Sequence, residues 1–199
     1  MGARFIVGAV MVIFAYLSTS QACNWHDSVA LYRNGLAVNP RSFVCYNNLG
    51  KIYESRGDDI YAHELYAKAV QMNPNFAVGY TNLAGLAMVA GKSDEAISLF
   101  QIALKEQPDC GGAHAGLANA LMSRHEYAAA LHEWVATVKF VPDSARARYT
   151  LGLTLMHLGE DKKAIVQFQD ALDLQPSLSV AKEMLRQTAS RAEPKPNTR

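Results

Sequence analysis

Five prolines recur at one fixed interval along this chain of 199 residues, and that interval constrains the fold more than any other feature. They are Pro40, Pro74, Pro108, Pro142 and Pro176, and the same spacing separates each from the next. A proline ends a helix because it lacks the amide hydrogen and because its ring clashes with the preceding turn. A period of about 34 residues, as found here, is typical of stacked two-helix units. The sequence therefore predicts an array of helical hairpins.

The same interval aligns residues of similar size. Two columns hold small residues, and they are Ala62, Ala96, Ala130 and Ala164, and Ala69, Ala103, Thr137 and Ala171. Bulky aromatic residues form another column: Tyr66, Phe100, Trp134 and Phe168. Small residues let paired helices approach closely, and large residues fill the space toward the neighbouring hairpin. A fourth column, expected to turn the chain after each first helix, holds Gly57, Gly91, His125 and Gly159.

At these positions the chain resembles the tetratricopeptide repeat family, from about Trp25 to Leu185. The resemblance implies an all-α fold, a superhelix or α-solenoid of antiparallel helix pairs. One column departs from the family, which often has tryptophan or tyrosine early in the first helix. Tyr46 and Tyr80 fit this pattern, whereas His114 and Arg148 do not. We therefore expect looser packing at these two positions.

The interval divides the chain into eight segments. They are a hydrophobic anchor or signal segment (1–22), an incomplete first repeat (23–42), four complete repeats (43–76, 77–110, 111–144 and 145–178), a capping helix (179–190) and a disordered tail (191–199). Residues 27–38 are expected to form the second helix of the incomplete repeat. The amphipathic segment 179–190 has the polar outer side that the end of a repeat stack requires.

The most apolar stretch is Phe5–Leu17, which follows Arg4. It fits a signal peptide cut before Cys23, and it also fits a membrane helix if extended toward the ~20 residues that a span needs. Residues 10–22 coincide with the first helix of the incomplete repeat, which favours a retained, single-pass membrane anchor over residues 4–22. Arg4 favours repeats on the non-cytoplasmic side. Cleavage would instead give a secreted or periplasmic protein.

The composition and the motifs of the chain exclude several classes of function. Lysine plus arginine total 19 and aspartate plus glutamate total 18, for a net charge of +1. A protein that binds phosphate backbones usually has a basic excess, so no nucleic-acid partner is expected. Three widely spaced cysteines argue against a disulfide scaffold or a structural zinc site. The chain contains no phosphate-binding loop, dinucleotide fingerprint or His-Glu-x-x-His motif, so we expect no enzyme, no cofactor and no metal.

The remaining candidate is a binding surface on the inner face, which the first helix of each repeat lines. Helical spacing places on it Asn47, Asn48, Lys51, Thr81, Asn82, Gly85, Gly112, Ala115, Gly116, Asn119, Arg146, Tyr149, Thr150 and Leu153. The family resemblance implies an asparagine ladder for a peptide backbone at Asn48 and Asn82, broken at Gly116 and Thr150. The small-sided stretch 111–116 indicates either a trough for a partner segment or a weak repeat.

These observations favour a membrane-tethered scaffold. Its groove would hold an extended or helical segment of a partner protein and support assembly of a membrane-associated complex. Two alternatives stay open. The segment from Trp25 through Asn39-Pro40 to Gly50 resembles the junction between membrane span and repeats in polytopic membrane glycosyltransferases of the transmembrane O-mannosyltransferase type, which implies a detached repeat domain. Signal cleavage would instead imply a secreted or periplasmic assembly factor.

Overall fold

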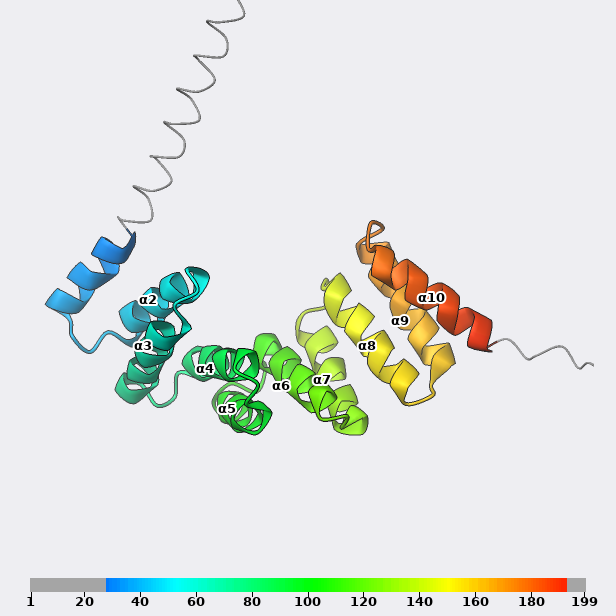
Figure 1. The fold of residues 1–199 in the computed structure, drawn as a ribbon, viewed down its shortest axis with the longest axis horizontal. Coiled ribbons are helices and arrows are strands. Elements are labelled where there is room, and N and C mark those ends of the chain that lie inside the picture. Colours follow the sequence, from blue (N-terminus) through cyan, green and yellow to red (C-terminus); the bar gives the residue numbers. More distant parts are fainter. Residues whose placement is uncertain (1–27, 193–199) are drawn as a thin grey trace, which may run out of the picture. The chain divides into compact units, whose positions relative to one another are not determined.

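A computed structural model describes residues 28–192, which consist entirely of helices and connecting turns. The described residues fall into two compact units, one that ends at Pro74 and one that begins at Asn75 (Figure 1). The proposed anchor over residues 4–22 and the cleavage site before Cys23 lie outside the described residues. Within residues 28–192, none of the helices combines the length and the apolar character needed to span a membrane.

The first unit contains one helical hairpin and the helix that precedes it. A helix runs through residues 28–38, where the sequence predicts the second helix of the incomplete repeat. It is followed by α2 (Phe43–Ser55) and α3 (Asp59–Met72), which pack against each other. Val29, Leu49 and Leu65 are buried in a common apolar cluster. The helix at residues 28–38 therefore packs on the α2–α3 hairpin through Val29.

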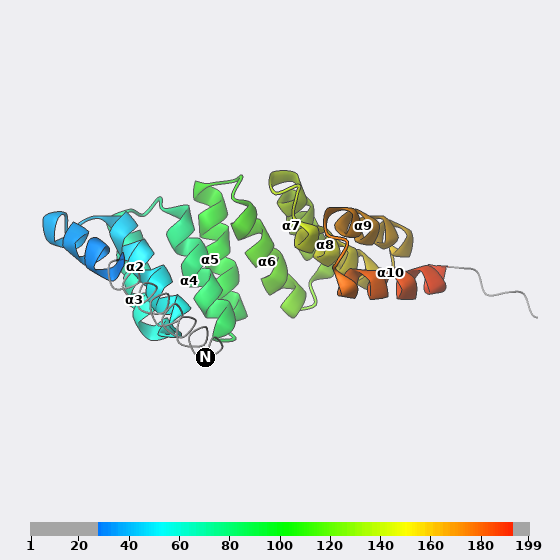
Figure 2. The same ribbon diagram turned by 90° about the horizontal axis from the view of Figure 1, so that it is seen from above.

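The second unit contains three hairpins and a final helix. The hairpins are α4 (Ala77–Val89) with α5 (Ser93–Glu106), α6 (Gly111–Ser123) with α7 (Tyr127–Phe140), and α8 (Ala145–His157) with α9 (Asp161–Leu174). The final helix α10 (Ser179–Ala192) packs against α9. Figure 2 shows the same succession from a second direction. The helices α4, α6 and α8 begin at the residues that open the predicted repeats.

The columns of small and aromatic residues make the core. Ala96, Ala130 and Ala164 are completely buried, and so is Phe168. Glycine permits the closest approach: a Cβ atom on Gly152 would lie 2.6 Å from Cε1 of Phe168. The aromatic residues were predicted to fill the space toward the neighbouring hairpin, and Phe100 does so, because a Cβ atom on Gly116 of the next hairpin would meet its ring. Phe168 instead packs against Gly152 of its own hairpin.

The turn after each first helix uses the left-handed backbone conformation. Gly57, Gly91 and Gly159 have φ angles of 78°, 75° and 76°, and His125 has a φ angle of 62°. An L-residue adopts this region at an energetic cost that glycine avoids. The His125 Nδ1 atom lies 2.8 Å from the Tyr127 hydroxyl, so the histidine side chain has a local polar partner.

The expectation of looser packing at His114 and Arg148 was wrong. The His114 ring stacks on Phe140, and its Nδ1 atom lies 2.6 Å from Oε2 of Glu133. Arg148 donates from Nη1 to Oδ2 of Asp170 at 2.9 Å. Both side chains replace an aromatic packing residue with a polar contact to the second helix of the same hairpin.

The boundary of the C-terminal tail also needs correction. The predicted capping helix ends at residue 190, but α10 continues to Ala192. Arg191 donates from Nη2 to Oδ1 of Asp161 at 2.6 Å, and this ion pair fixes the last turn of α10 to the start of α9. The predicted disordered tail therefore loses its first two residues to the helix, and residues 193–199 lie outside the described residues.

Candidate functional site

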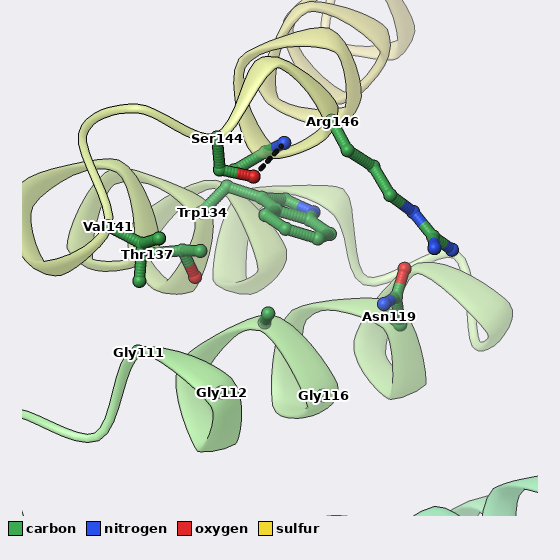
Figure 3. A pocket seen from close by; sticks show the side chains of 11 residues that line it. Gly111, Gly112, Gly116, Asn119, Trp134, Thr137, Val141, Ser144 and Arg146 are labelled. Atoms are coloured by element: carbon green, nitrogen blue, oxygen red, sulfur yellow. Dashed lines mark hydrogen bonds between the residues drawn. The ribbon is translucent and has the colours of Figure 1, made fainter.

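A pocket of about 420 Å³ opens in the second unit between α6, α7 and the start of α8 (Figure 3). Its lining comes from two successive hairpins and from the turn that joins them. The lining residues are Gly111, Gly112, Ala115, Gly116, Asn119, Trp134, Thr137, Val141, Ser144, Arg146 and Ala147. The volume lies within the range of small-ligand pockets, which also suits a few residues of a bound peptide.

The glycines of α6 create this pocket in two different ways. A Cβ atom on Gly112 would meet nothing within 4 Å, so the missing side chain leaves open space. A Cβ atom on Gly111 would instead lie 2.4 Å from Cγ2 of Val141, and one on Gly116 would lie 2.2 Å from Cζ of Phe100. Gly111 and Gly116 therefore serve close packing, whereas Gly112 keeps the pocket open. The small-sided stretch therefore borders a pocket, and both interpretations of it stay predictions.

The pocket wall is apolar, and its polar atoms already have partners. Trp134 is 3% exposed, and its indole N–H donates to the sulfur of Met122 at 3.2 Å. The Thr137 hydroxyl donates to the carbonyl of Glu133 at 2.8 Å. The Ser144 hydroxyl accepts the Ala147 amide at 3.2 Å and so caps α8. These groups shape the wall without leaving hydrogen-bonding capacity that demands a ligand.

Two polar side chains at the edge of the pocket differ from this wall. Figure 3 shows the Arg146 side chain reaching from α8 toward the side of the pocket where Asn119 rises from α6. Both residues are exposed. Among the described residues, neither side chain has a hydrogen-bond or ion-pair partner. Arg148, two residues further along α8, is instead paired with Asp170.

The structure gathers only part of the predicted groove into this pocket. Five of the predicted residues line it: Gly112, Ala115, Gly116, Asn119 and Arg146. The remaining residues of the second unit do not, and they are Thr81, Asn82, Gly85, Tyr149, Thr150 and Leu153. Asn48 and Lys51 belong to α2 in the first unit.

Asn47 requires a correction. It is 4% exposed, and its Nδ2 atom donates to Oδ1 of Asn48 at 3.5 Å. Its place in the helix points the side chain into the hairpin, so it cannot contribute to an exposed face. The two asparagines of the proposed ladder, Asn48 and Asn82, are partly buried and each has an interaction within the protein.

Sequence reasoning missed the pocket residues outside the first helices. Trp134 and Thr137 belong to the aromatic and small-residue columns, and the sequence indicates only a packing role for them. Whether these two residues also line a pocket depends on the side chains of the residues opposite them. A signal was present in Gly112, because a residue without a side chain at the start of a helix uncovers the wall behind it.

Glu133, which precedes the lining residue Trp134 in sequence, is paired. Glu133 contacts His114 on the other helix of the hairpin, and Nε2 of His114 lies 2.9 Å from the Pro108 carbonyl. Within residues 28–192, no group of three His, Cys, Asp or Glu side chains is placed to hold a metal ion. The arrangement supplies an apolar recess with one cation and one amide at its edge.

Comparison with known proteins agrees with this architecture. Models of the tetratricopeptide repeat match residues 44–73, 81–139 and 117–179. No curated protein sequence matches the chain. Among solved structures, the chain is similar to YrrB, described as a tetratricopeptide-repeat protein with an unusual peptide-binding site. The TM-score is 0.66 and the identity 19%, over 84% of this chain and 86% of that chain.

Two further structures show the same likeness. MamA from Desulfovibrio magneticus RS-1 gives a TM-score of 0.67 and 24% identity, over 83% of this chain and 85% of that chain. A chain of the Cut9–Hcn1 hetero-tetramer of the APC/C gives 0.75 and 17%, over 85% of this chain and 34% of that chain. At these identities the likeness concerns the fold. None of these three structures is described as a membrane glycosyltransferase.

Proposed function

Because the chain belongs to the tetratricopeptide-repeat family, we propose that it is a binding scaffold whose α6–α8 pocket receives a segment of a partner protein. The fold supports a protein-interaction role, and the pocket offers a place for it. A segment bound there would contact two successive hairpins at once. Such a scaffold acts by holding its partner, and the proposal includes no reaction.

One observation carries this proposal: the open space over Gly112 beside the buried indole of Trp134. A helix gains stability when glycine is replaced by alanine, so an uncovered glycine in a helix has a conformational cost. Here it leaves an apolar recess that a side chain of a partner can fill. Burying such a side chain contributes about 1.5–3 kcal/mol to binding.

We expect Gly112→Leu to abolish peptide binding while the protein stays folded. The new side chain meets no atom at its Cβ position and extends into the pocket, so it competes with the ligand without overpacking the core. The measurement uses the full-length chain and a displayed library of random 12-residue peptides. Peptides enriched on the wild type are then titrated against the variant, and circular dichroism checks that helicity is unchanged.

The matched control is Ala128→Leu, which adds an exposed leucine to α7 at a residue outside the pocket lining. This control should bind the enriched peptides as the wild type does. Undiminished binding by a folded Gly112→Leu variant would reject the pocket as the site. A wild type that enriches no peptide would reject the binding function proposed for it.

The proposal extends to the membrane. We infer that residues 4–22 remain attached and tether the scaffold, which would then support assembly of a membrane-associated complex on the non-cytoplasmic side. The support is the apolar run Phe5–Leu17 and its coincidence with the first helix of the incomplete repeat. The competing interpretations are a cleaved, secreted or periplasmic assembly factor and a detached repeat domain of a membrane glycosyltransferase.

Intact mass and N-terminal sequencing of the protein from separated membrane and soluble fractions test the tether. We expect the uncleaved chain in the membrane fraction. A soluble protein beginning at Cys23 would replace the tethered scaffold by the secreted assembly factor. This result would leave the pocket and its peptide binding unaffected, because the pocket lies in the second unit.

A further inference from the structure

We propose that the helix at residues 28–38 lies on the surface of the membrane, with the side that carries Leu31 and Val38 in the lipid. This inference rests on the proposed tether over residues 4–22, and it adds a second contact between the chain and the bilayer. It concerns the first unit alone, so it does not depend on the α6–α8 pocket of the second unit.

The helix at residues 28–38 (blue in Figure 1) is apolar on two sides, and the described part of the chain covers only one of them. Val29 is buried, and Tyr32 and Leu36 pack with it in the apolar cluster of α2 and α3. Leu31 and Val38 are seven residues apart, which places them on a common face of the helix. They are 65% and 88% exposed, so this face has no apolar partner within residues 28–192.

The complete hairpin of the same unit covers the corresponding side of its second helix. Leu65 of α3 stands one repeat interval after Leu31, and it is only 3% exposed. Around Leu31, Ala30 and Ala37 are exposed as well, with Asn34 as the polar residue between them. An apolar face of this kind marks a contact with a protein or a membrane.

The proposed tether keeps this helix close to the membrane. Only residues 23–27 separate the end of the anchor from the start of the helix. An extended chain spans at most about 3.6 Å per residue, so the helix begins within about 20 Å of the end of the anchor. Trp25 lies in this linker, and tryptophan is enriched where a membrane meets water. Residues 10–22 cannot cover the exposed face while they remain in the hydrocarbon, because they would have to lie beside the helix to do so.

The charges in this part of the chain suit an anionic lipid surface. From residue 28 to residue 53 the chain contains Arg33, Arg41 and Lys51 and no aspartate or glutamate, and one acid, Asp27, directly precedes this stretch. All three basic residues are exposed, and Arg33 donates to the neutral hydroxyl of Tyr53. Basic residues next to a membrane segment are attracted to anionic headgroups. The apolar side chains of an interfacial helix enter the boundary between headgroups and acyl chains.

Photo-crosslinking of the full-length chain identifies what covers this face. The photoreactive residue p-benzoylphenylalanine is introduced in place of Leu31 or of Val38, and each protein is reconstituted into nanodiscs of phosphatidylcholine and phosphatidylglycerol. After irradiation, we expect adducts that are heavier than the protein by the mass of one lipid. The matched control carries the same residue in place of Ile60, an aliphatic residue of α3 in the same unit that is 80% exposed. It should give several-fold fewer lipid adducts.

Three other results would overturn the inference. Cross-links from position 31 or 38 to residues 10–22 would make the hydrophobic segment the occupant of the face, and covalent dimers would make it a second copy of the chain. Equal yields of lipid adduct at positions 31, 38 and 60, from a chain that stays in the discs, would reject the lipid contact and leave the tether standing. If the chain does not enter the discs, the tether and this inference fail together. Peptide binding that Gly112→Leu blocks would in that case still uphold the pocket.

Discussion

Replacing Phe168 with alanine is expected to lower the free energy of unfolding of the second unit by about 3–5 kcal/mol. Phe168 is fully buried between the helices of the last hairpin. Its ring lies against the backbone of Gly152 and 5.9 Å from the ring of Tyr149, measured between centroids. Alanine would remove these contacts and leave a cavity, because Gly152 has no side chain with which to fill it.

Chemical denaturation of the full-length chain, followed by circular dichroism, measures this loss. Val166→Ala is the control in the same helix, since Val166 is 55% exposed. Its truncation should change stability by no more than about 0.5 kcal/mol. A similar loss from both variants would show that α9 responds to any truncation. An unchanged Phe168→Ala variant would contradict the packing of the hairpin.

The fold could be predicted because its determinants are local and repeated. Each hairpin needs a proline stop, a left-handed turn and small residues opposite large ones, and all recur at the same interval. Even the exception at His125 was predictable, since position within the repeat, and not residue type, fixes its φ angle of 62°. A pattern that recurs in every repeat predicts the fold more reliably than a single copy of it would.

The site could be predicted only in part because it depends on contacts between hairpins. Helical spacing indicates which residues share a face, and three of the residues that it places on the inner face, Gly112, Asn119 and Arg146, line one pocket. Spacing does not say how deeply a face is covered. Asn47 is therefore buried despite its polar side chain, and Trp134 lines a pocket despite its place in a core column.

His114 and Arg148 show a related limit. These two residues differ from the family pattern because each stands where the family often has an aromatic residue. The structure gives each a carboxylate on the facing helix, Glu133 and Asp170 respectively. The compensating residues lie 19 and 22 positions further along the chain, and the pattern of the first helix alone contains no sign of them. Such pairs become visible only when the two helices are placed together.

Gly116→Ala is expected to destabilise the second unit by about 1–3 kcal/mol, although alanine is the better helix former. The added Cβ atom would lie 2.2 Å from Cζ and 2.3 Å from Cε1 of Phe100, which is 3% exposed. The ring has no space to retreat without moving its neighbours, because protein interiors are close-packed. The contact joins α6 to α5 of the preceding hairpin, so the strain falls between repeats.

Gly85→Ala separates this strain from the effect of helix propensity. Gly85 lies within α4 as Gly116 lies within α6, but a Cβ atom on Gly85 meets nothing within 4 Å. It should therefore stabilise the unit by about 0.5–1 kcal/mol. Opposite signs in denaturation midpoints are the expected result, and equal stabilisation would contradict the Gly116–Phe100 contact. The same chemical change then reports whether a glycine serves packing or leaves space, the distinction on which the pocket at Gly112 depends.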